Sequence, residues 1–129
     1  MKAVIAADFN DWENLLEHFI DADFIFVESN YDLELLRLNY NPNSRFHMPN
    51  PETGRLLCRM RNDSMKPPQA VMLGHLSLIR NEPQIALKEI EHRFRDKGIE
   101  MDFELLAAPG LTASEVVRIN ASEGVASRG

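Results

Sequence analysis

The sequence has a single cysteine, Cys58, among its 129 residues. One thiol excludes a disulfide within the chain and favours a reducing compartment, so a cytoplasmic protein is expected. No apolar run approaches the roughly 20 residues that a membrane-spanning helix requires, and we expect no association with membranes. Residues 1–7 contain one lysine and a short apolar run, but acidic residues follow at once, a pattern that does not favour a secretory signal.

Basic residues are also in deficit. The chain has 14 lysines and arginines against 20 acidic residues, a formal net charge of −6, which argues against broad nucleic-acid binding. Residues 41–66 reverse this balance, with five basic side chains against two acidic ones. This basic stretch can face an anionic substrate, or it can be a solvated helix surface, and the second interpretation is favoured.

The remaining composition is that of one ordinary globular domain. Hydrophobic residues make up 44% and charged residues 26% of the chain, and the length suits a single core. Short apolar runs predict strands at residues 2–7, 24–27, 70–73 and 101–107, with 116–119 as a final edge strand. The runs at 24–27 and 70–73 are apolar on both faces, which is typical of parallel sheets covered on both sides. If one side were left open, we would expect self-association.

Amphipathic periodicity and capping residues predict helices between these strands. Residues 11–21 carry apolar side chains at helical spacing, and 31–39 is leucine-rich with Ser29 and Asn30 as possible caps. A stiff proline-containing loop at 41–51 leads into a helix at 52–61, and a helix of about fourteen residues begins at Pro83 and ends at Gly98. The predicted fold class is α/β, with a mostly parallel three- to four-stranded sheet and packed helices.

Two polar residues directly follow predicted strands. Asp8 follows the first strand and His75 follows the third. The carboxyl ends of parallel strands meet at one edge of a sheet, so we expect the two side chains to lie within about 10 Å of each other. Carboxylates and neutral imidazoles bind zinc and similar divalent ions. The alternative is structural: a helix cap for Asp8 and a hydrogen-bonded turn residue for His75.

Four segments, in this order, resemble the C-terminal half of metallo-β-lactamase-fold metal-dependent hydrolases of the phosphodiesterase and exonuclease-like branch. They are Ala6-Ala7-Asp8-Phe9-Asn10, the stretch Glu28-Ser29-Asn30-Tyr31-Asp32 after an apolar strand, Leu73-Gly74-His75-Leu76-Ser77, and Asn81-Glu82-Pro83. The resemblance covers about residues 2–119. It implies a partial domain at 1–119, half of an αββα sandwich. Residues 120–129 are small and polar, and we expect a disordered tail there. The resemblance also implies that Asp8 is a metal-bridging ligand and His75 the last histidine ligand.

A third candidate, His47, lies in the proline-containing loop. Phe46-His47-Met48-Pro49-Asn50 resembles a His-Leu-Ser-Asn segment of the same branch, which implies that His47 lies near the substrate as a catalytic residue. An imidazole beside Arg45 can hold or protonate a phosphate-like oxygen. A hydrogen-bonded loop residue is the alternative.

The chain also departs from this family. Tyr31 stands where a histidine is usual, and Asn10 where a glycine is usual. The His-x-His-x-Asp-His signature is absent from the sequence. His18 and His92 are expected in solvent and do not replace it. Catalytic zinc takes about three protein ligands, whereas only Asp8 and His75 are assigned. Zinc or another divalent metal is therefore expected in a full-length relative, without tight binding by this chain.

Three hypotheses about function follow. The first is a remnant or segment of a metal-dependent hydrolase acting on small anionic, phosphodiester or related ester substrates, inactive without a missing N-terminal half. The second is a non-catalytic half-domain that acts as a dimer or interaction module. The third, an unrelated receiver-like α/β domain, ranks last because no phosphoacceptor aspartate ends a central strand.

Overall fold

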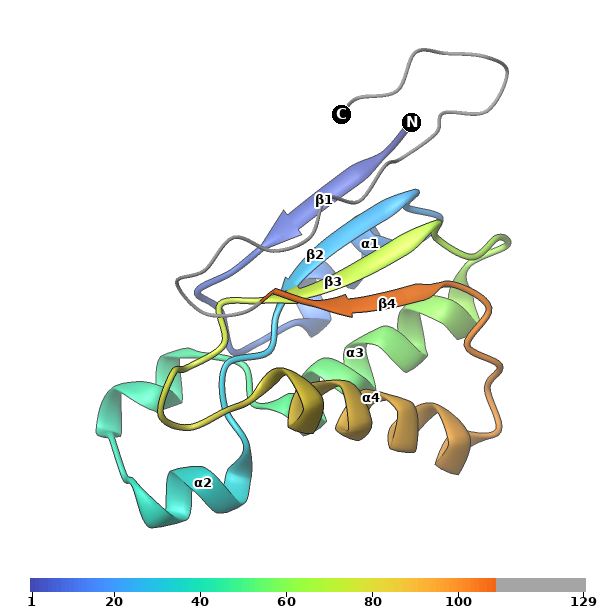
Figure 1. The fold of residues 1–129 in the computed structure, drawn as a ribbon. Coiled ribbons are helices and arrows are strands. Elements are labelled where there is room, and N and C mark those ends of the chain that lie inside the picture. Colours follow the sequence, from blue (N-terminus) through green and yellow to red (C-terminus); the bar gives the residue numbers. More distant parts are fainter. Residues whose placement is uncertain (109–129) are drawn as a thin grey trace.

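Four parallel strands form the sheet in the computed structural model, which describes residues 1–108. They are β1 (Ala3–Ala6), β2 (Phe24–Glu28), β3 (Ala70–Gly74) and β4 (Glu104–Ala107). Each strand pairs in parallel with the next, in the order β1-β2-β3-β4 (Figure 1). The predicted α/β fold class is confirmed. Among the described strands β1 lies at an edge, and this order differs from the 2-1-3-4-5 order of receiver-like sheets. The strand predicted at 116–119 and the tail at 120–129 lie outside the described residues.

The helices connect successive strands. Two long helices, α3 (Asn50–Asp63) and α4 (Pro83–Lys97), pack on one face of the sheet together with the single turn α1 (Leu16–Phe19) (Figure 1). A short helix α2 (Leu33–Leu38) and two 3-10 segments, Glu13–Leu15 and Pro42–Phe46, complete the helical elements. Gly98, with a φ of 68°, ends α4 as predicted. Within residues 1–108, none of these helices has the length and apolar character needed to cross a bilayer.

The core lies between the sheet and these helices. Ile25, Val27, Val71 and Leu73 point to the helical side and are fully buried there. Alternate residues face the opposite side of the sheet, where Ile5 of β1 is 78% exposed and Phe24 and Phe26 of β2 are half-buried. The expectation of burial on both faces therefore holds for β3, all of whose residues are buried, but not for β2.

Several boundaries differ from the sequence-based expectations for identifiable reasons. The helix expected at 11–21 is a 3-10 turn followed by one α turn, and neither has a side-chain cap. Asp32, rather than Ser29 or Asn30, caps α2 by accepting a hydrogen bond from the Leu35 backbone amide at 3.0 Å. The strand β4 begins at Glu104 instead of 101. The residues before it make other contacts: Asp102 pairs with Arg61, and the Phe103 ring packs against the Phe94 ring of α4.

Candidate metal centre

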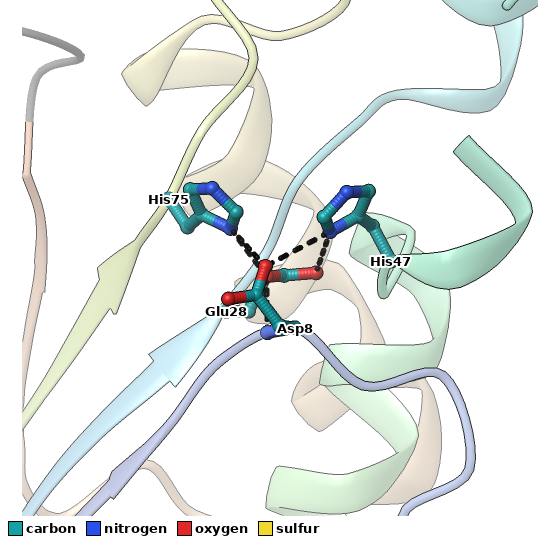
Figure 2. A group of neighbouring side chains, drawn as sticks. All are labelled: Asp8, Glu28, His47 and His75. Carbon is teal, nitrogen blue, oxygen red and sulfur yellow. Dashed lines mark hydrogen bonds and ion pairs between the residues drawn. The ribbon is translucent and has the colours of Figure 1, made fainter. Parts of the chain in front are cut away.

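Three polar side chains come together at the carboxyl edge of the sheet. Asp8 follows β1, Glu28 is the last residue of β2, and His75 follows β3 (Figure 2). The Nδ1 atom of His75 lies 3.6 Å from Oδ1 of Asp8. This proximity, expected from parallel strands alone, is confirmed.

A fourth side chain reaches the same place from a different part of the chain. His47 lies between the 3-10 segment Pro42–Phe46 and α3. Its Nδ1 atom is 3.1 Å from Oε2 of Glu28 and 3.7 Å from Oδ1 of Asp8. The rings of His47 and His75 meet edge to face with centroids 5.1 Å apart. Ligand atoms of all four residues lie within 4.8 Å of one another.

Glu28 is the centre of this group and is completely buried. One carboxylate oxygen accepts a hydrogen bond from the backbone amide of Asp8, and the other from the amide of Met48, each at 2.8 Å. The Nδ1 atoms of His75 and His47 approach these same oxygens at 2.5 and 3.1 Å. A buried carboxylate requires such donors to stay ionised. We therefore assign an Nδ1–H to each imidazole in the absence of metal.

Two of the four residues have an unusual backbone conformation. Asp8 and His75 have φ values of 59° and 54°, in the left-handed region that L-residues rarely adopt. A Cβ placed on the preceding Gly74 would lie 1.9 Å from Cζ of Phe26, so a larger residue there would have to displace the Phe26 ring. Such conformations persist only where surrounding contacts impose them, and they are common at functional sites.

A buried polar network fixes the segments around the cluster. The Ser29 hydroxyl donates to the Asn50 side-chain oxygen at 2.6 Å, the Asn50 amide donates to Asn81 at 3.0 Å, and the Asn81 amide donates to the Ser29 carbonyl at 2.8 Å. All three residues are at most 3% exposed. This network ties the starts of α3 and α4 to the residue that follows Glu28.

The structure brings together all three site residues predicted from the sequence, Asp8, His47 and His75, and adds Glu28. Glu28 belonged to a recognised segment but was given no role. Its signal was its place as the last residue of an apolar strand that ends at the same edge. The expected number of two possible ligands is therefore wrong, because four residues meet here.

The other residues noted in the sequence lie outside the cluster. Tyr31 is buried, and this burial raises the pKa of its phenol. The side-chain amide of Asn10 donates to the carbonyl of Arg45 at 2.5 Å. His18 and His92 are exposed, as expected.

The basic stretch at 41–66 does not converge on the cluster. Four of its basic side chains pair with carboxylates: Arg55 with Glu52, Arg59 with Asp63, Arg61 with Asp102, and Lys66 with Asp23. The guanidinium of Arg45 lies over the Phe46 ring, 4.4 Å from its centroid. These contacts support the interpretation of a solvated helix surface.

Within residues 1–108, this is the one group of three or more histidine, cysteine or acidic side chains arranged to hold a metal ion. Two imidazoles and two carboxylates suit zinc and other divalent transition metals. The cluster can thus hold a metal ion. Comparisons with protein-family models, with curated proteins and with solved structures gave no match for this chain.

Proposed function

We propose that this chain binds one divalent transition metal ion, zinc being the best fit, at the cluster of Asp8, Glu28, His47 and His75. We further propose that it is the metal-binding segment of a hydrolase acting on phosphodiester or related ester bonds. The observation that carries the metal proposal is the convergence of two imidazoles and two carboxylates, with ligand atoms within 4.8 Å of one another. The hydrolase proposal rests on the sequence resemblance.

The four residues have different environments and hence different roles. The side chain of Asp8 is 74% exposed and that of Glu28 is completely buried. Asp8 is therefore the ligand on the open side, where a substrate can approach. Glu28 lies beneath the imidazoles of His47 and His75 (Figure 2), whose Nδ1 atoms face its two oxygens. A bound ion would take the place of the Nδ1 protons, because the same nitrogens face Asp8, and Glu28 would then be a ligand. A bound divalent ion would polarise an ester oxygen and acidify water.

Hydrolysis by the chain alone is not expected. Each ion of a two-metal site takes about three protein ligands, and the described residues provide one cluster of four. A second ion would need ligands from another polypeptide segment. We propose that a missing N-terminal half supplies them, and that the purified chain has no appreciable phosphodiesterase activity.

A second candidate function is a non-catalytic half-domain that self-associates or binds a partner. The exposure of β1 favours it, because Ile5 is 78% exposed on the face opposite the described helices (Figure 1). Apolar surface of this kind marks interaction sites when it is extensive.

Metal binding can be tested by calorimetric titration of the chelator-treated chain with Zn²⁺ and by optical titration with Co²⁺. We expect one ion per chain and a Co²⁺ spectrum with nitrogen and oxygen ligands. The His75→Ala variant should lose this binding, whereas His92→Ala, which removes an exposed imidazole, should retain it. Equal binding by both variants would contradict the proposed site.

The activity statement needs a separate assay with a generic phosphodiester such as bis(p-nitrophenyl) phosphate. We expect no turnover above background with added Zn²⁺ or Mn²⁺. Metal-dependent turnover that disappears in Asp8→Ala would show that the isolated chain is itself an enzyme.

A further inference from the structure

His75 has a left-handed backbone conformation, which contacts with other residues must stabilise. The residue follows Gly74, over which the Phe26 ring lies so closely that any Cβ there would have to displace the ring. His75 itself has a side chain and a φ of 54°, a combination that the chain does not adopt without external support. The imidazole can reach Glu28 only if this conformation is maintained.

Asn30 contacts the turn at His75 from both sides. Its side-chain amide donates to the His75 carbonyl at 2.6 Å, and its own carbonyl accepts from the Ser77 amide at 2.8 Å. The residue before it, Ser29, donates its backbone amide to the Gly74 carbonyl at 3.0 Å. The Asn30 side chain is thus the one that holds the His75 peptide, while Glu28 holds the His75 ring at 2.5 Å.

The same residue also touches the other histidine segment. The backbone amide of Asn30 donates to the carbonyl of Met48, the residue after His47, at 2.7 Å. This contact uses main-chain atoms and survives any substitution other than proline. The contact to His75 uses the side-chain amide and is lost on substitution. Changes at Asn30 therefore separate the two imidazoles experimentally.

We propose that Asn30 is a positioning residue for the metal centre, which fixes the backbone of His75 so that its imidazole meets Glu28 and a bound ion. The inference rests on the proposed function, since it assigns a role toward the same ion. An amide is required at this position because only a donor can face the His75 carbonyl. An aspartate of the same shape would place a negative oxygen against that carbonyl and repel it.

The test compares Asn30→Ala and Asn30→Asp with Asn14→Ala, which removes an exposed amide that makes no described contact. Three quantities are measured: Co²⁺ affinity, imidazole ¹⁵N shifts of the metal-free chain, and unfolding in urea. We expect a loss of about 10- to 100-fold in Co²⁺ affinity for both Asn30 variants. The Nδ1–H signal of His75 should weaken or disappear in the metal-free chain, while that of His47 stays. The Asn14 control should match the wild type.

The outcomes separate this inference from the metal proposal. If the wild type binds no Co²⁺, the proposed function fails, and the His75 signal of the metal-free chain alone decides the role of Asn30. Unchanged Co²⁺ affinity together with an unchanged His75 signal overturns the inference. It is also overturned if both Asn30 variants unfold, or if the two histidine signals change together, because Asn30 would then stabilise the fold rather than position one imidazole.

Discussion

Asp8 and Asp21 have the same backbone conformation, with φ at 59° for both, yet they occupy opposite ends of the sheet and face different partners. The Asp21 carboxylate accepts hydrogen bonds from the backbone amides of Met65 and Lys66 at 2.7 and 3.3 Å. Within the part of the chain that is described, the Asp8 carboxylate meets only the imidazoles of His47 and His75, at 3.7 and 3.6 Å. A strained aspartate is thus structural at one end and free to bind an ion at the other.

The charged groups around the two aspartates also differ. At the Asp21 end, the neighbouring Asp23 carboxylate pairs with the Lys66 ammonium at 2.8 Å. At the Asp8 end, the completely buried Glu28 faces two imidazoles, with the exposed Asp8 carboxylate 3.6 and 3.7 Å from the same nitrogens. Clusters with more acidic groups than fixed cations suit a divalent ion, whereas one-to-one pairs leave no such demand.

The largest expected effect on the free energy of unfolding is at Glu28, whose buried carboxylate accepts a hydrogen bond from the Asp8 backbone amide. Glu28→Gln keeps the shape but turns an amide group toward donors, so it should lower the free energy of unfolding by about 2–4 kcal/mol. Urea unfolding measures this, with the exposed Glu91→Gln as the control. A change below about 0.5 kcal/mol would mean that the buried carboxylate is not held as described.

The comparison itself is tested by Asp8→Ala and Asp21→Ala. Both substitutions place alanine at the same positive φ, so the free-energy cost of that backbone conformation is the same in the two variants. Asp21→Ala also loses two hydrogen bonds and should be less stable than Asp8→Ala by about 1–2 kcal/mol. Co²⁺ affinity should fall in Asp8→Ala alone. Loss of affinity in both variants, or in neither, would remove the distinction between the two ends.

A smaller, pH-dependent effect is expected at the Asp21 end. The Lys66 ammonium, followed by the Lys2 backbone amide, lowers the pKa of Asp23 below its ordinary value. The resulting stabilisation is present above the ordinary aspartate pKa of about 3.9 and is lost as the pH falls through the lower, folded-state value. Asp23→Asn should therefore cost less than about 1 kcal/mol at pH 7 and progressively less below pH 4.

Urea unfolding at several pH values measures this difference, with the exposed Asp96→Asn as the control. A cost of Asp23→Asn that grows on acidification would have the wrong sign.

The smallest effect on stability is expected at Ile5, on the face of the sheet opposite the described helices. Ile5→Lys should change the free energy of unfolding by less than about 0.5 kcal/mol, because Ile5 is 78% exposed. The same change should reduce self-association and binding of a hydrophobic dye. Leu78→Lys, at a residue that is 66% exposed and outside the sheet, should change neither. A wild-type chain that is monomeric and binds no dye would contradict the half-domain interpretation.

The sequence predicted the parts of this structure that depend on local pattern. Apolar runs located the strands, and parallel pairing then placed Asp8 and His75 at one edge without any knowledge of the site. The end of α4 at Gly98 was predicted because a left-handed glycine is a strong local signal. The helix at 11–21 was overextended, because the apolar spacing there is satisfied by a 3-10 turn and a single α turn.

The end of an apolar strand could place Glu28 at the edge of the sheet, but its burial and its hydrogen bonds are tertiary properties that the sequence does not give. Its carboxylate is buried only because the Asp8 and Met48 backbones, 20 residues away in each direction, bring their amides to it. Asn50 was expected in the loop at 41–51, but it is the first residue of α3 and its side chain points into the buried network with Ser29 and Asn81. Both cases involve polar groups whose partners come from distant segments, which no local pattern encodes.

The most direct test of the central claim is a crystal structure of the chain grown with zinc, with diffraction data collected on both sides of the zinc absorption edge. The account predicts one anomalous peak among Asp8, Glu28, His47 and His75, with ligand atoms of at least three of these residues about 2.0–2.2 Å from the ion. The same map would show whether Glu28 is among these ligands. Saturating zinc with no peak at this position, or a peak elsewhere while the four side chains keep their described arrangement, would contradict the account.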